Sequence, residues 1–251
     1  MASKFEDKKE KIMSVPLYAA FNLCAPRPVA VLTTIRKGLG IHDEYFARMP
    51  GFSYNPDFDY DAAPMSTLTL QGKRPPKHTG PFESAGPPVH LVSVTGTRKT
   101  YAGLLETGEA VANFLWPKQK DVEKMYVLSD GSYNSGNKKI KDSGFTLQDS
   151  QKLNVPIIRE AMSWIEYKLI RMVEVPESER PIFLLEPVAA YSLEGLVDSK
   201  TYTYVTKNVP VGQLGANIFS GKMQNSIVAK RRTQGMKFTL PQHWEYSDKK
   251  R

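Results

Sequence analysis

The chain has 251 residues, a length that suits one large domain or two small ones. Hydrophobic residues make up 41% of it and charged residues 24%, which is ordinary for a globular protein and excludes a chain that is disordered throughout. The formal net charge of +8 suits an anionic ligand, a nucleic acid or an acidic partner, and does not choose among them.

Cysteine and histidine are scarce. Cys24 is the one cysteine of the sequence, so an intrachain disulfide and a cysteine-based zinc site are both excluded. The four histidines are scattered and show no metal-ligand spacing. The first residues lack the apolar segment of a secretory signal, and no apolar run approaches the roughly 18 residues of a membrane span. We therefore expect a cytoplasmic protein that has no metal site and does not enter a membrane.

The first elements are predicted between residues 27 and 88. Arg27–Ile35 is a β-branched run of strand length, with Pro28 near its start. Residues 40–62 are rich in Tyr, Phe, Asp and Pro without clear periodicity, which predicts a long loop. This loop is either a lid over a site or an insertion packed on the surface. Ala63–Gly72 has the pattern of a strand, and a loop dense in Pro and Gly follows over residues 73–88.

A hydroxyl-rich turn is predicted between a strand and a helix. Val89–Gly96 has the pattern of a buried strand, and residues 99–109 fit a short helix with Gly108 as its C′ glycine. The turn "TRKT" between them, residues 97–100, brings hydroxyls and two cations to a helix N-terminus. A phosphate prefers such a site. Serine and threonine are also common on strand faces and at N-caps, so these residues taken alone favour an ordinary capped turn.

The second half of the chain predicts more strands. Residues 118–150 look helical at first and then irregular, because turn residues crowd the segment from residue 130 onward. Trp164–Val175 and Pro181–Leu193 have strand patterns, and residues 176–180 fit a hairpin connection between them. Many strands and few short helices predict a mainly antiparallel barrel or sandwich rather than a doubly wound sheet.

No arrangement of residues for acid–base or nucleophilic catalysis is apparent. There is no Gly-x-Ser-x-Gly, GxGxxG or Walker A motif, and His90 lies in an apolar strand where a structural histidine is expected. Such a chain can leave the chemistry to a cofactor that it binds and orients. A nucleic-acid-binding barrel would instead need aromatic residues interleaved with cations on one strand face, and the predicted strands lack that pattern.

Five short pieces of sequence occur in a fixed order: "PRPVAVLTT", "APMS", "PPVHLVSVTGTRKTYAGLLETGE", "SGFT" and "VGQLGANIF". This order resembles the flavin reductase-like family of FMN-binding split barrels, which includes flavoredoxins and the reductase components of two-component monooxygenases. Asp61 stands where the family pattern has Asn. The residues that match the pattern are Pro26, Arg27, Pro28, Ala63, Pro64, Ser66, Pro87, Pro88, Val89, Ser93, Arg98, Lys99, Thr100, Thr107, Gly108, Glu109, Leu214 and Gly215.

The resemblance implies a mainly β fold, an antiparallel Greek-key split barrel with a few short helices. It covers residues 15–220, with residues 1–14 as an N-terminal extension and residues 221–251 as a basic tail. It further implies a homodimer with FMN at or near the subunit interface. The cofactor-binding residues that it implies are Ala63, Pro64, Met65, Ser66 and Thr67 along the flavin, Ser93, Val94, Thr95 and Gly96 along the ring edge and ribityl chain, and Arg98, Lys99 and Thr100 at the phosphate.

The implied activity is that of an NAD(P)H-dependent flavin reductase, an oxidoreductase that passes electrons from NADH or NADPH through FMN to an acceptor. No side chain is assigned a catalytic role, since hydride transfer to a flavin needs no general base. The acceptor would be another protein, such as a monooxygenase. An alternative is an FMN-binding electron carrier of the flavoredoxin type without NAD(P)H oxidation of its own. Relatives of pyridoxamine-phosphate oxidase share the barrel type, but the motif order argues against them.

Overall fold

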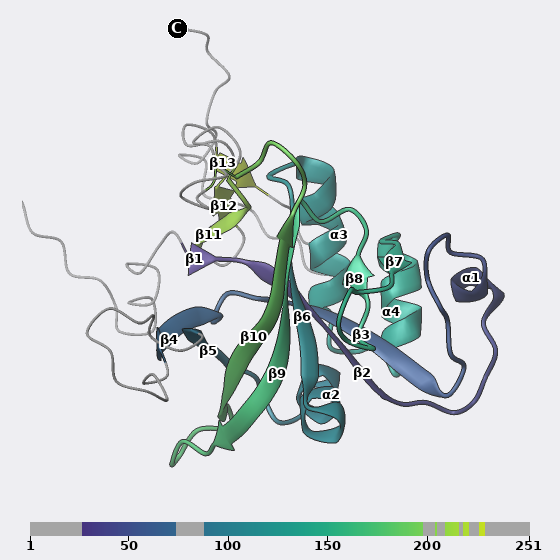
Figure 1. The fold of residues 1–251 in the computed structure, drawn as a ribbon, viewed down its shortest axis with the longest axis horizontal. Helices are drawn as coiled ribbons and strands as arrows, with labels where there is room; N and C mark the ends of the chain where they lie inside the picture. Colours follow the sequence, from purple (N-terminus) through teal and green to yellow (C-terminus); the bar gives the residue numbers. More distant parts are fainter. Residues whose placement is uncertain are drawn as a thin grey trace, which may run out of the picture.

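The computed structural model describes residues 27–73, 88–197, 204, 209–215, 218–220 and 226–228. Its main body is a seven-stranded antiparallel sheet with the strand order β3-β2-β6-β9-β10-β5-β4 (Figure 1). These strands are β2 (Ala30–Lys37), β3 (Phe58–Met65), β4 (Thr69–Lys73), β5 (Pro88–Ser93), β6 (Glu109–Phe114), β9 (Ser163–Val173) and β10 (Ile182–Ser192).

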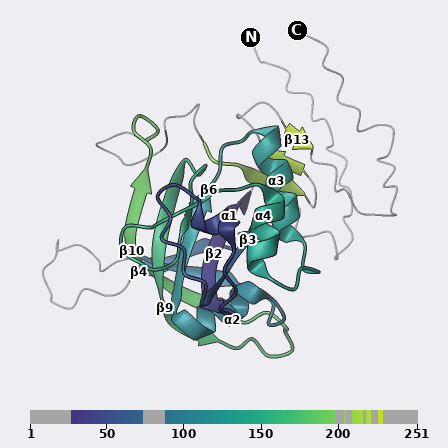
Figure 2. The same cartoon turned by 90° about the vertical axis from the view of Figure 1, so that its right-hand side faces the viewer.

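Smaller elements surround this sheet. A second sheet pairs β1 (Arg27–Pro28), β11 (Gly212–Gly215), β12 (Ile218–Ser220) and β13 (Ser226–Val228), and a third pairs β7 (Leu147–Gln148) with β8 (Ile157–Ile158). The helices are α1 (Glu44–Ala47), α2 (Lys99–Thr107), α3 (Gln119–Ser129) and α4 (Gly136–Ser143). Figure 2 shows α3 and α4 side by side beyond the β3 edge of the main sheet, with α2 at one end of the strands.

A short link closes the main sheet on itself. Its edge strands β3 and β4 are consecutive in the chain, and residues 66–68 alone separate them. The sheet must therefore curl until its two edges approach each other. The Thr67 hydroxyl connects this link to the end of β5, because it accepts a hydrogen bond from Ser93 N at 3.2 Å and donates one to Ser93 O at 3.0 Å. The expected mainly β, antiparallel barrel is confirmed.

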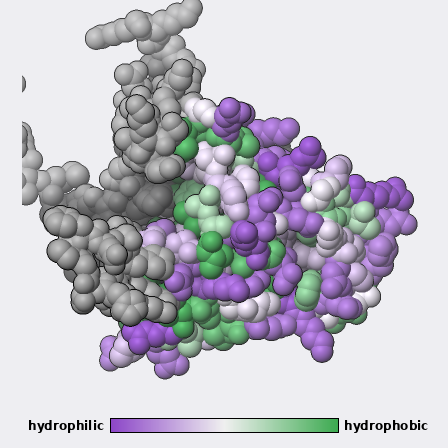
Figure 3. Space-filling view, in the orientation of Figure 1, coloured by the Kyte–Doolittle hydropathy of each residue, from purple (hydrophilic) through white to green (hydrophobic). Residues whose placement is uncertain are grey.

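Alternation along the strands divides the core into two clusters. In β2, Val31 and Ile35 belong to the cluster that packs under α3 and α4, while Ala30 and Leu32 belong to the cluster inside the barrel. This is the two-residue period of a strand that is buried on both faces. Leu104 of α2 joins the inner cluster. The face seen in Figure 3 is mainly hydrophilic, with hydrophobic residues in scattered groups.

Residues 40–62 form neither a lid nor a surface insertion, so that expectation is wrong. The segment contains α1, and β3 begins at Phe58. The Phe46 and Tyr60 rings are 0% and 2% exposed and belong to the cluster under α3 and α4. Their centroids lie 6.3 Å apart, and Phe52 and Tyr54 pack against both rings. The aromatic residues of this segment therefore build the core.

Two other expectations are also corrected. The predicted strand 63–72 is two elements, the end of β3 and most of β4, because residues 66–68 make the closing link. The segment from residue 130 onward contains a regular helix, α4, which Ser135 caps by accepting a hydrogen bond from Lys138 N. Gly144 ends it in the left-handed conformation, at φ 71°. Turn residues at both ends of this helix hid it in the sequence.

The predicted strand 27–35 is likewise two elements, β1 and β2, which belong to different sheets. The predicted strand 89–96 is observed as β5, which ends at Ser93. The other expected elements are confirmed. Helix α2 ends at Gly108 with φ 67°, and β9 and β10 pair as an antiparallel hairpin across residues 174–181. Several expectations lie outside the described residues: the extension 1–14, Cys24, Pro26, Pro87, the inner part of the loop 73–88 and most of the tail 221–251. Among the described helices, none is long and apolar enough to cross a membrane.

Candidate functional site

A pocket of about 200 Å³ lies where the barrel closes, between the end of β3, the end of β5, the start of α2 and the segment that joins α3 to α4. Eleven of the twelve cofactor-binding residues expected from the sequence line it, and Gly96 does not. The eleven are Ala63, Pro64, Met65, Ser66, Thr67, Ser93, Val94, Thr95, Arg98, Lys99 and Thr100.

The turn between β5 and α2 brings the start of a helix to this pocket. Strand β5 ends at Ser93, and α2 begins at Lys99 with Arg98 as its N-cap residue. Arg98 has an extended backbone and forms no side-chain cap hydrogen bond. The first N–H groups of α2 therefore receive no capping side chain, and the start of a helix carries a partial positive charge. The hydroxyl-capped turn considered as the simple alternative is not what the structure shows at Arg98.

Three hydroxyls of the pocket hold its frame together. Thr67 bonds to both backbone groups of Ser93, and the Ser93 hydroxyl donates to the Arg180 carbonyl oxygen at 3.3 Å. Thr100, which is fully buried, donates its hydroxyl to Asp61 Oδ2 at 2.7 Å. Gly96, which does not line the pocket, donates its N–H to the Glu179 carbonyl oxygen at 3.1 Å. These bonds tie the closing link, the turn and the β9–β10 hairpin into one frame.

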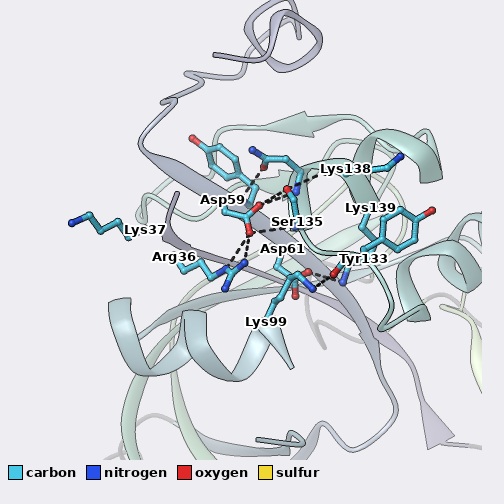
Figure 4. A network of polar contacts seen from close by, with 12 residues as sticks. Arg36, Lys37, Asp59, Asp61, Lys99, Tyr133, Ser135, Lys138 and Lys139 are labelled. Atoms are coloured by element: carbon cyan, nitrogen blue, oxygen red, sulfur yellow. Dashed lines mark hydrogen bonds and ion pairs between the residues drawn. The ribbon is translucent and has the colours of Figure 1, made fainter. Parts of the chain in front are cut away.

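Four cationic side chains and two carboxylates line the pocket, an excess of two positive charges. Lys99 donates its ammonium to the Tyr133 carbonyl oxygen (Figure 4). The Arg98 guanidinium lies directly against Gly131, where a side-chain methyl group would overlap it. The Arg180 side chain is 58% exposed. An anion in this pocket would therefore be held by charge as well as by hydrogen bonds.

The fourth cation, Lys139, was not foreseen from the sequence. It comes from α4, and its Nζ lies 2.5 Å from Asp61 Oδ1 (Figure 4). The two side chains are 7% and 1% exposed. The cap residues Ser135 and Gly144 are signals that could have revealed α4 among the turn residues, but no local signal predicts that α4 packs against β3. Thr97 also lines the pocket and belongs to the predicted turn at residues 97–100. The other lining residues that sequence reasoning missed are Leu128, Ser129, Asp130, Gly131 and Arg180.

Asp59 explains why α4 lies against β3. Its carboxylate accepts from Asn137 N at 3.0 Å, from Gly136 N at 3.3 Å and from the Ser135 hydroxyl at 2.9 Å, all at the start of α4. Arg36 Nη2 donates to the same carboxylate at 2.7 Å. Burial acts to raise the pKa of Asp59, but these hydrogen bonds outweigh it and hold the pKa below its usual value. A buried anion at the N-terminus of α4 thus fixes the helix that carries Lys139.

His90 and Tyr167 are two buried titratable groups that contact each other. The His90 Nδ1 atom lies 2.5 Å from the Tyr167 hydroxyl, and burial lowers the pKa of His90 and raises that of Tyr167. This agrees with the expected structural histidine. Within the described ranges, no group of three or more His, Cys, Asp or Glu residues is placed to hold a metal ion.

Comparisons with known proteins agree on the fold. The sequence model of the flavin reductase like domain matches residues 83–212, just over half of the chain. This range includes the turn at residues 93–100 and leaves out residues 63–67, at the end of β3 and in the closing link. No curated protein matches the sequence significantly.

Solved structures share the architecture at low sequence identity. The 2-nitrobenzoate 2-nitroreductase of Pseudomonas fluorescens has a TM-score of 0.57 at 20% identity, over 91% of this chain and 93% of its own. An FMN-binding protein from Thermus thermophilus has a TM-score of 0.56 at 20% identity, over 88% and 99%. A split-barrel domain protein from Shewanella frigidimarina, assigned as a flavin reductase, has a TM-score of 0.55 at 13% identity, over 96% and 99%. The barrel is therefore a split barrel.

Proposed function

The chain belongs to the family of flavin reductase-like domains, and from this premise we propose that it binds FMN and passes electrons from NADH or NADPH through it to an acceptor. One observation carries the proposal. Eleven residues that the resemblance assigns to FMN, from three separate segments of the sequence, line a single pocket with an excess of positive charge.

The pocket's donors suit a flavin phosphate. A phosphate monoester carries up to two negative charges and accepts hydrogen bonds at three oxygens. Helix N–H groups, short hydroxyls and cations are the donors that such an anion prefers. The start of α2 has donors of all three kinds, and its cations are Arg98 and Lys99. We assign the phosphate to these residues and to the backbone N–H of Thr100, because the Thr100 hydroxyl already donates to Asp61 Oδ2.

The rest of the flavin is assigned to the barrel side of the pocket. Residues 63–67 would lie along the flavin, with Pro64 and Met65 offering apolar surface. Ser93, Val94 and Thr95 would follow the ring edge and ribityl chain, while Gly96 would act by turning the chain toward α2. When bound, FMN supplies the hydride and electron transfer. The protein's own groups then bind and orient the cofactor, so none of them needs to serve as a general base.

Further parts of the proposal concern organisation and partners. We assign the flavin-binding unit to residues 15–220, between an extension of residues 1–14 and a basic tail of residues 221–251. The protein would act as a cytoplasmic homodimer. Its electrons would go to an acceptor protein such as a monooxygenase component.

The first experiment is the visible absorption spectrum of the purified protein, followed by titration of its flavin-free form with FMN. The double variant Arg98→Ala/Lys99→Ala should bind FMN about a hundredfold or more weakly, since each charge-assisted hydrogen bond contributes about 1.5 to 3 kcal/mol. Arg48→Ala/Lys138→Ala is the matched control, because it removes two exposed cations that pair within their own helices. Equal FMN affinity in all three proteins would refute the phosphate assignment.

A second experiment separates the reductase from the carrier. NADH or NADPH is added without oxygen to the FMN-loaded protein, and the flavin absorbance is followed. Bleaching at a catalytic rate supports the reductase. A flavin that dithionite reduces but that neither nucleotide bleaches would identify the electron carrier instead.

A further inference from the structure

A buried network of three residues lies on the wall of the pocket. Asp61 of β3 accepts the Thr100 hydroxyl from α2 at 2.7 Å on one oxygen. Its other oxygen lies 2.5 Å from the Lys139 ammonium of α4. Asp61 thereby joins the two helices that flank the pocket, and all three residues line the pocket.

Lys139 has more hydrogen-bonding capacity than the described residues use. An ammonium group has three N–H donors. Asp61 is the one ion-pair partner found for the Lys139 ammonium among the described residues, and its Oδ1 atom has no hydrogen-bond partner there. The Lys139 side chain is only 7% exposed. A nearly buried cation is costly unless further acceptors satisfy it. Since Lys139 lines the pocket, an anion bound there can provide those acceptors.

We propose that Lys139 is a further ligand of the flavin phosphate, and that Asp61 is the positioning residue that holds its ammonium there. This inference rests on the proposed function and adds α4 to the phosphate site. Asp61 alone would place a negative charge beside the phosphate. The positive charge of Lys139 balances the negative charge of Asp61, so this pair adds no net charge to the pocket. The positive excess then comes from Arg98, Lys99 and Arg180, which outnumber the remaining carboxylate, Asp130.

A simpler role for Lys139 would be to neutralise the buried carboxylate of Asp61, without contacting the ligand. A comparison of FMN with riboflavin separates the two roles, because riboflavin lacks the phosphate and is otherwise the same molecule. The single variant Lys139→Met removes the ammonium and leaves Asp61 unpaired. The double variant Asp61→Asn/Lys139→Met removes both charges, so it retains a neutral network of similar volume.

The measurement is the affinity of the flavin-free full chain for FMN and for riboflavin, followed by flavin fluorescence. We expect Asp61→Asn/Lys139→Met to bind FMN about ten- to a hundredfold more weakly than the unsubstituted protein, with riboflavin affinity changed less than about threefold. The control is Lys138→Met, the exposed neighbour on α4 that pairs with Asp142. Thermal unfolding of each variant shows whether the comparison is made between folded proteins.

The outcomes are distinct. Weaker FMN binding in the double variant, with riboflavin unaffected, supports the assignment. If the double variant binds FMN as tightly as the unsubstituted protein, Lys139 only neutralises Asp61 and the inference is overturned. Equal losses for both flavins would also overturn it, since they would indicate a general change of the pocket. Failure of the unsubstituted protein to bind either flavin would instead refute the proposed function.

Discussion

Replacing Asp59 with asparagine tests whether one buried carboxylate fixes α4 against β3. The carboxylate accepts five hydrogen bonds: two from Arg36, two from backbone N–H groups at the start of α4, and one from Ser135. Asparagine keeps one oxygen acceptor, but its NH₂ group would face the other donors. The NH₂ group would face Arg36 and Gly136 N if it replaced Oδ2, and Ser135 and Asn137 N if it replaced Oδ1.

The expected loss of stability at pH 7 is about 2 to 3 kcal/mol. Breaking a fully buried ion pair costs about 3 to 5 kcal/mol. The Arg36 side chain is 29% exposed and the Asp59 side chain 10%, so water recovers part of that penalty and the lower figure applies. Glu44→Gln is the control, because it also removes one carboxylate from an ion pair but at a site where that side chain is 71% exposed. Its effect should stay below about 0.5 kcal/mol.

The pH dependence has a defined sign. The pKa of Asp59 is lower in the folded protein than in the unfolded chain, so its stabilisation is fully present above the unfolded value of about 3.9. It is lost as the pH falls through the folded pKa. The stability gap between the unsubstituted protein and Asp59→Asn should therefore be constant from about pH 5 upward and narrow below about pH 4.

The assay is urea unfolding at several pH values, followed by tryptophan fluorescence. Two results would refute this reasoning. One is an Asp59→Asn variant as stable as the unsubstituted protein at pH 7. The other is a stability gap that persists unchanged into the acid range, since the lost interaction would then not depend on the ionised carboxylate.

Two further predictions concern packing, each measured by urea unfolding. Gly136→Ala should lower the free energy of unfolding by about 1 to 3 kcal/mol, because the added methyl group would overlap the Tyr60 carbonyl oxygen. Its control is Gly96→Ala, whose methyl group would come no nearer than 3.8 Å to the Glu179 carbonyl oxygen. Equal losses in the two variants would contradict the close approach of α4 to β3. Phe46→Ala should lower the free energy of unfolding by about 3 to 5 kcal/mol, since that ring is fully buried. A loss below about 1 kcal/mol would mean that residues 40–62 lie on the surface and are not part of the core.

Local sequence signals predicted the elements that depend on interactions between residues close together in the chain. Helix α2 with its C′ glycine Gly108 and the β9–β10 hairpin follow from short-range periodicity and turn chemistry, and they appear as expected. Motif order identified the family and pointed to the turn at residues 93–100. That turn lines the pocket because a strand end and a helix start are adjacent in the sequence.

Long-range contacts decided the rest. Asp59 and Asp61 interrupt the apolar pattern of β3, so the sequence indicates a loop there. The strand forms because Arg36, Ser135, Thr100 and Lys139 satisfy the two carboxylates from other elements. The aromatic residues of the 40–62 segment likewise become core residues only once β3 and α3 lie beside them. Lys139 enters the site for the same reason: charge pairing across the fold, rather than any local pattern, places it 2.5 Å from Asp61.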